Sequence, residues 1–128
     1  MQAGPQRIVQ ALFGFVLVVF AFMPLFGWEP PPVRPEALQM QEAIFASGYI
    51  IPAILIVYFF VGMSWILGQF VALSSIMLVP ISLNIVLFHS LLNQTPASLT
   101  AAYALLAVNL YMLYRNRASY RQLFDRER

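Results

Sequence analysis

The sequence predicts an all-α, polytopic membrane four-helix bundle with a short interfacial helix in its first loop. Of the 128 residues, 61% are hydrophobic and only 9% are charged, whereas soluble domains carry about 25% charged residues. Charged residues are also absent from residues 8–28 and from residues 43–114. Because one membrane-spanning helix needs about 20 apolar residues, the first gap accommodates one span and the second accommodates three.

The first predicted span covers residues 8–26 and contains Pro24 in its last turn. At 1.5 Å per residue this span is about 28 Å long, close to the thickness of the hydrocarbon region. The apolar run is longer than the core of a typical signal peptide and is followed by no A-x-A cleavage pattern. We therefore expect a retained span, with Gln10 near its start at the membrane interface.

The first loop contains the predicted interfacial helix. Pro35 is suited to the first turn of a helix, and residues 36–46 (EALQMQEAIFA) have a helix-forming composition. Apolar side chains such as Phe45 can lie on the membrane surface while Glu36 and Glu42 face water. This pattern favours a helix that lies on the membrane rather than across it.

The remaining three spans are predicted at residues 49–67, 71–92 and 99–114. The link at residues 68–70 is so short that the second and third spans should form an antiparallel helical hairpin. Residues 93–98, NQTPAS, form a cluster typical of a turn between the last two spans. The whole chain, residues 1–128, is thus predicted to be a single four-span membrane domain.

The arginines predict the orientation of the spans. Five of the seven lie in the basic tail, residues 115–128, and Arg7 precedes the first span, whereas Arg34 is alone in a loop. With four spans the two termini share one side, so the positive-inside rule predicts that both are cytoplasmic. The same rule accounts for the net charge of +2, and we expect no nucleic-acid partner.

Composition excludes several kinds of chemistry. Without cysteine the chain cannot form a disulfide relay, an iron–sulfur cluster, a thiolate zinc site or a covalent haem link. Without lysine it cannot form a Schiff base, and no glycine-rich phosphate loop follows a strand. The acidic residues Glu29, Glu36 and Glu42 lack the spacing of metal ligands on one helix. We therefore expect no metal site and identify no cofactor from composition.

Polar side chains inside the spans are the candidate functional residues, because every polar group in lipid needs a partner. His89 is the only histidine, and Ser82, seven residues earlier, shares its helix face. His89 is interpreted either as a proton-accepting or ligand-binding group that faces a cavity, or as an interfacial side chain bonded to water or to a loop carbonyl.

Two asparagines are the other candidates within the spans. Asn84 follows Pro80 by four residues, and Pro80 lacks the N–H that would pair with the Ile76 carbonyl. We expect this segment to face protein. Asn84 and Asn109 are interpreted as ligand contacts or, more simply, as side chains that join helices by hydrogen bonds.

Several segments resemble the DoxX-like family of small integral membrane proteins. These are ASGYIIP (46–52), VGMSWILGQFVAL (61–73) and PISLNIVLFHSLL (80–92). The loop FGWEPPPVRPEA and the ending YMLYRNRASYRQLF are also similar, so the resemblance covers nearly the whole chain. It implies a four-helix protein of the bacterial inner membrane, in a family whose names come from subunits associated with quinone-linked oxidation of sulfur compounds.

The chain departs from the DoxX-like pattern at two positions. Many members carry a glutamate in the second span, where this chain has Tyr58, and a basic residue after the next glycine, where it has Gln69. Both departures remove charge and weaken the transfer of redox or proton chemistry. The ligand-binding candidates are therefore His89, Asn84, Tyr58, Ser82 and Asn109, and the catalytic residues are unknown.

Three functions are consistent with these features. The leading hypothesis is a non-catalytic accessory or binding subunit of a membrane assembly, which contacts lipid and either a membrane protein partner or further copies of itself. The alternative is a quinone-linked redox subunit, with His89 and Asn84 bonded to quinone carbonyls near Tyr58. A transporter of small apolar solutes is a further alternative, although no charged coupling site is visible.

Overall fold

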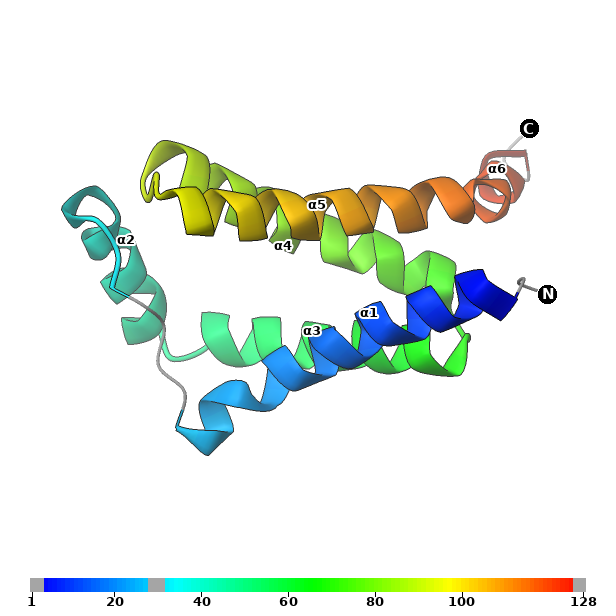
Figure 1. The fold of residues 1–128 in the computed structure, drawn as a ribbon, viewed down its shortest axis with the longest axis horizontal. Helices are drawn as coiled ribbons and strands as arrows, with labels where there is room; N and C mark the ends of the chain where they lie inside the picture. The colour runs from blue at the N-terminus through cyan, green and yellow to red at the C-terminus, as the bar shows by residue number, and fades with distance from the viewer. Residues whose placement is uncertain (1–3, 28–31, 126–128) are drawn as a thin grey trace.

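The structure is a computed structural model that describes residues 4–27 and 32–125 of the chain (Figure 1), and every regular element in them is a helix. This confirms the predicted all-α class. The elements in order are α1 (Gly4–Phe22), the 3₁₀ turn η1 (Met23–Phe26), α2 (Pro35–Ala46), α3 (Ile50–Leu67), α4 (Val71–Leu91), α5 (Pro96–Arg115) and α6 (Arg117–Asp125).

Four of these helices, namely α1 with its continuation η1, α3, α4 and α5, are long and apolar enough to cross a membrane. Two helices begin earlier than the apolar pattern predicts, α1 at Gly4 and α5 at Pro96. At α5 the cause is a cap, because the Thr95 hydroxyl accepts a hydrogen bond from the Ser98 backbone N–H at 3.3 Å. Helices thus extend beyond the apolar runs.

The long helices are arranged as two antiparallel pairs, α1 against α3 and α4 against α5 (Figure 1). The pairs lie close together at the end of the molecule that holds both termini, here called the termini end. They diverge toward the opposite end, where α2 lies, here called the α2 end (Figure 1). The short turn between α3 and α4 joins the pairs at the termini end.

The α1–α3 pair is held by direct contact between helix backbones. A Cβ atom added to Gly62 would lie 2.6 Å from the Gly14 carbonyl oxygen and 2.7 Å from a methyl carbon of Val18. A Cβ added to Gly14 would lie 2.5 Å from the Gly62 carbonyl oxygen. Close backbone approach of this kind is the usual role of small residues between membrane helices.

Arg7 and Gln10 attach the start of α1 to the end of α3. The Arg7 guanidinium donates hydrogen bonds to the carbonyls of Trp65, at 2.9 Å, and of Ile66, and the Gln10 amide donates to the Trp65 carbonyl at 3.0 Å. A cation at this position also complements the negative end of the helix dipole. Gln10 is completely buried, so the expectation that it lies at the membrane interface was wrong.

A small apolar core joins the two pairs near the termini end. Its buried members come from all four long helices and are Leu17, Val61, Trp65, Val71, Leu78 and Met112. Toward the α2 end, α2 takes over the bridging role, and its Ala37 is completely buried. The predicted short helix of the first loop is therefore present, at Pro35–Ala46.

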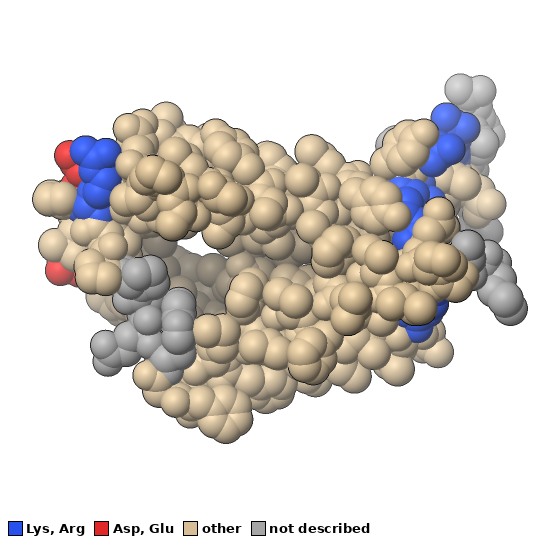
Figure 2. Space-filling model, in the orientation of Figure 1, with Lys and Arg blue, Asp and Glu red and all other residues tan. Residues whose placement is uncertain are grey.

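Charge is confined to the two ends of the molecule in the described residues. Figure 2 shows blue arginine atoms at the termini end, blue and red atoms beside α2 at the α2 end, and an uncharged surface between them. An uncharged band of this kind is what the hydrocarbon region of a bilayer requires. The chain is accordingly a multi-pass membrane protein by the length and composition of its helices.

We predict that Gly62→Ala destabilises the protein by about 1–3 kcal/mol, because the added methyl group must displace the α1 backbone. The free energy of unfolding, measured by denaturant titration in micelles, tests this. Gly4→Ala is the matched control, since nothing lies within 4 Å of a Cβ added at Gly4. Equal stability of the two variants would contradict the backbone contact.

Candidate functional site

Ser82 and Asn109 are the only two sequence candidates that the structure brings into contact within the described residues. The Ser82 hydroxyl donates to the Asn109 side-chain oxygen at 2.8 Å, and the Asn109 amide donates to the Ser75 carbonyl at 2.9 Å. All three residues are completely buried. Asn109 of α5 therefore holds α4 through two hydrogen bonds, which is the structural alternative that the sequence left open.

Other buried hydroxyls also bond to the protein. The Ser64 and Ser74 hydroxyls lie 2.9 Å apart across the α3–α4 turn, and Ser64 also donates to the Gln69 carbonyl. Ser75 donates to the Val71 carbonyl at 2.7 Å, within its own helix. Hydroxyl groups satisfied in this way need no further partner inside a membrane.

His89 lies near the α2 end of α4 and contacts Asn93 of the α4–α5 turn. The Asn93 side-chain oxygen accepts the Arg34 backbone N–H at 3.0 Å, which directs the Asn93 amide group toward His89 Nδ1, 3.3 Å away. Because an amide NH₂ only donates, Nδ1 is the acceptor and the proton of neutral His89 is on Nε2. His89 thus supports the turn as a partner of Asn93.

The Arg34–Asn93 contact was missed by sequence reasoning. Asn93 belongs to the cluster NQTPAS, which predicted a turn but no long-range partner, yet its side chain is 97% shielded and bonded to the start of α2. The Arg34 guanidinium reaches the Gln94 carbonyl at 3.4 Å and forms an exposed ion pair with Glu36. These contacts tie α2 to the α4–α5 pair.

Asn84 and Tyr58 lie apart from the other candidates. Asn84 is exposed on α4 and donates to the Pro80 carbonyl at 3.0 Å, so it bonds its own helix rather than the unpaired Ile76 carbonyl. Five residues separate Asn84 from His89, which places them about 140° apart around the helix. Tyr58 of α3 is half-buried against the apolar core. No shared ligand position joins these three described residues.

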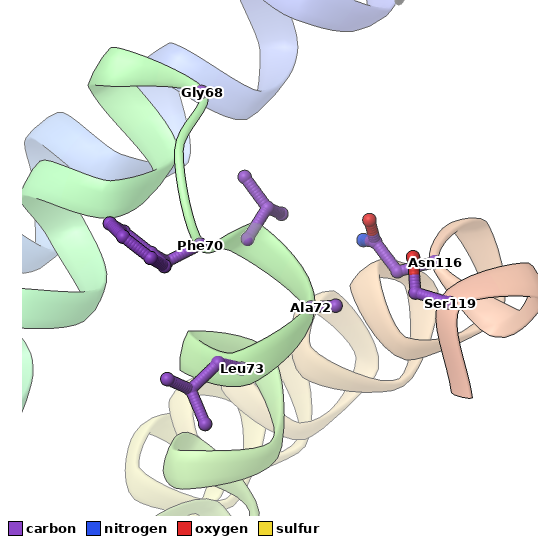
Figure 3. A pocket seen from close by; sticks show the side chains of 7 residues that line it. Gly68, Phe70, Ala72, Leu73, Asn116 and Ser119 are labelled. Atoms are coloured by element: carbon purple, nitrogen blue, oxygen red, sulfur yellow. The ribbon is translucent and has the colours of Figure 1, made fainter. Parts of the chain in front are cut away.

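The largest pocket in the described part of the chain lies at the termini end and contains none of the candidates. Its volume is about 440 Å³, and Figure 3 shows Asn116 and Ser119 beside the start of α4. It is lined by Gly68, Phe70, Val71, Ala72, Leu73, Asn116 and Ser119. Next to it the Tyr120 hydroxyl donates to the Ala72 carbonyl at 2.7 Å, and partial burial raises the pKa of this hydroxyl.

Acidic and histidine side chains do not converge in the described part of the chain, where no group of three or more could hold a metal ion. Two buried polar atoms there, Gln10 Oε1 and Trp65 Nε1, have no hydrogen-bond partner. Both are inaccessible from the surface, because their side chains are completely buried where α1 meets α3. They mark a cost of the close α1–α3 packing rather than an open binding position.

The fold and its buried hydrogen bonds define a class of protein: a small multi-pass membrane protein whose intramembrane polar groups mainly join its helices. Comparisons of the chain with protein-family models, with curated proteins and with solved structures find no match. The resemblance to the DoxX-like family therefore stays a prediction.

We predict that Ser82→Ala and Asn109→Leu have coupled effects on stability, because they remove two ends of one hydrogen bond. A double-mutant cycle in micelles should give a coupling free energy of about 0.6–1.7 kcal/mol, the range of such bonds between membrane helices. Thr100→Val is the control partner for Ser82→Ala, since Thr100 bonds only the Pro96 carbonyl of its own helix. Additive effects in the first pair would contradict the contact.

A second expected outcome concerns the attachment of α2. Asn93→Leu removes the acceptor of the Arg34 N–H, and one such bond contributes about 0.5–1.5 kcal/mol. Amide hydrogen exchange in α2 should therefore accelerate about 2- to 10-fold, with the α1–α3 pair unchanged. Gln94→Leu is the matched control, because the Gln94 side chain bonds only the Ser90 carbonyl. Equal exchange in both variants would show that Asn93 does not hold α2.

Proposed function

We propose that the chain is a small DoxX-like integral membrane protein that acts as a non-catalytic accessory or binding subunit of a membrane assembly. It would bind a lipid-like ligand or a membrane protein partner rather than transform a substrate. The observation that carries this proposal is the use of its buried polar side chains. Ser64, Ser74, Ser75, Ser82 and Asn109 all bond to one another or to helix backbone.

The arrangement of those groups does not resemble a catalytic constellation. General acid–base chemistry needs a titratable group within hydrogen-bond reach of the reacting atoms in an accessible site. His89 uses Nδ1 to accept from Asn93, and Asn84 lies on a different side of α4. This separation also weakens the quinone-linked alternative, which requires His89 and Asn84 to reach one ligand.

The place best suited to a lipid-like ligand is the space between the diverging helix pairs. Figure 2 shows a hollow there, beside α2 and between the α1–α3 and α4–α5 pairs. The described surface around it in this view carries no charged side chain. An acyl chain fits such a space, because apolar and mostly uncharged linings are typical of hydrophobic ligand sites.

The proposed location is the bacterial inner membrane, with both termini in the cytoplasm. Arg7, Arg115, Arg117 and Arg121 all belong to helix ends at the termini end, whereas Glu36 and Glu42 belong to α2 at the opposite end. The positive-inside rule supports this orientation. In it, α2 and the hollow beside it face the periplasmic side.

Native mass spectrometry after gentle extraction from the source membrane tests this function. We expect the chain to be recovered with a stoichiometric lipid or a different membrane protein. For a lipid, Asn93→Leu should reduce the bound fraction because α2 borders the hollow, whereas Gln94→Leu should not. Recovery with neither lipid nor partner protein would contradict the proposal, and recovery with a quinone would favour the redox-subunit alternative.

A further inference from the structure

One polar side chain on the surface of the bundle is unusual for its position. Among the described residues, Asn84 is the one exposed carboxamide in the interior of the four long helices. Asn109 and Gln10, the other carboxamides there, are completely buried. Asn84 therefore meets whatever surrounds the protein rather than the protein's own core.

Its depth places Asn84 in the hydrocarbon. Helix α4 has 21 residues, and Asn84 lies three residues from its midpoint at Ile81. At 1.5 Å per residue this is about 4.5 Å from the centre of the helix, whereas the hydrocarbon extends about 15 Å to either side of the bilayer centre. Neither water nor lipid headgroups reach this depth in an undisturbed bilayer.

The hydrogen-bonding capacity of Asn84 is only partly used. Its amide nitrogen donates one hydrogen bond, to the Pro80 carbonyl. Its side-chain oxygen accepts no hydrogen bond from the described residues, and its second N–H is also without an acceptor there. Thr100, which is exposed on α5, differs because its single hydroxyl proton is already bonded to the Pro96 carbonyl. Asn84 thus needs an external partner that both donates and accepts.

We propose that Asn84 is the centre of a contact between two copies of this chain, in which the two α4 helices pack side by side and the two carboxamides bond to each other. Each Asn84 would donate its second N–H to the oxygen of the other. The helix surface around Asn84 would supply the apolar part of the contact, from the exposed residues Leu73, Ile76, Pro80, Leu83, Leu87 and Leu91.

A second copy is the partner that fits best, because of how copies of one chain insert. All copies have the same orientation, so a two-fold axis along the membrane normal brings identical residues together at identical depth. A carboxamide carries both a donor and an acceptor and is therefore complementary to itself. Asparagine is also among the residues that hydrogen-bond across membrane helices. This contact does not depend on the proposed accessory function.

Förster resonance energy transfer between labelled copies in phosphatidylcholine vesicles tests the contact. The chain has no cysteine, so Gln122→Cys on exposed α6 provides one labelling position. In this background we expect Asn84→Leu to weaken association about 3- to 30-fold, the effect of losing one or two interhelical hydrogen bonds. Asn84→Gln, which keeps the carboxamide, should retain most of the association.

Thr100→Val is the matched control, because it also removes an exposed polar group from a long helix, and it should associate like the parent protein. Three results would overturn the proposal: a monomer at every protein-to-lipid ratio, unchanged association of Asn84→Leu, or a loss with Asn84→Gln as large as with Asn84→Leu.

Cross-linking keeps the proposal testable if Asn84→Leu fails to fold. A single cysteine at Leu87, on the proposed contact surface, should form a disulfide between copies when vesicles are oxidised, because symmetric packing brings its two Cα atoms within about 7 Å. A single cysteine at Leu110, which is exposed on α5, should not. Cross-linking at Leu110 but not at Leu87 would place the contact elsewhere and overturn the assignment.

Discussion

Asn109 holds α5 against α4 because the hydrocarbon offers its amide no water to bond with. The same constraint explains why Ser64 and Ser74 meet at the α3–α4 turn and why Arg7 and Gln10 bond the carbonyls at the end of α3. Apolar surface alone cannot assemble these helices, since lipid tails are as apolar as the side chains. Hydrogen bonds and backbone contact at Gly14 and Gly62 supply what the hydrophobic effect supplies in water.

The sequence predicted the four long helices and the short helix of the first loop, because charge and proline mark where apolar runs begin and end. It did not predict which helices pair. Hydropathy carries no information about partners, and Gly14 is not distinguished from other small residues until Gly62 is found against it. Helix starts at Gly4 and Pro96 were also missed, since helices continue into segments that are no longer apolar.

The candidate residues were chosen by type, and type did not determine their environment. Asn84 and Asn109 are the same amino acid in spans of similar length, yet one is exposed and the other completely buried. The separation of His89 from Asn84 around α4 follows from their spacing of five residues. The bond between Asn93 and the start of α2 could not be predicted, because it joins segments 59 residues apart.

Two helix pairs that touch at one end and diverge at the other have a mechanical consequence. The apolar core lies near the point of contact, so a small rotation of one pair about the α3–α4 turn disturbs the core little but displaces the far end by a longer arc. The bond between Arg34 and Asn93 lies at that far end. One hydrogen bond there therefore restrains the angle between the pairs more effectively than the same bond would near the core.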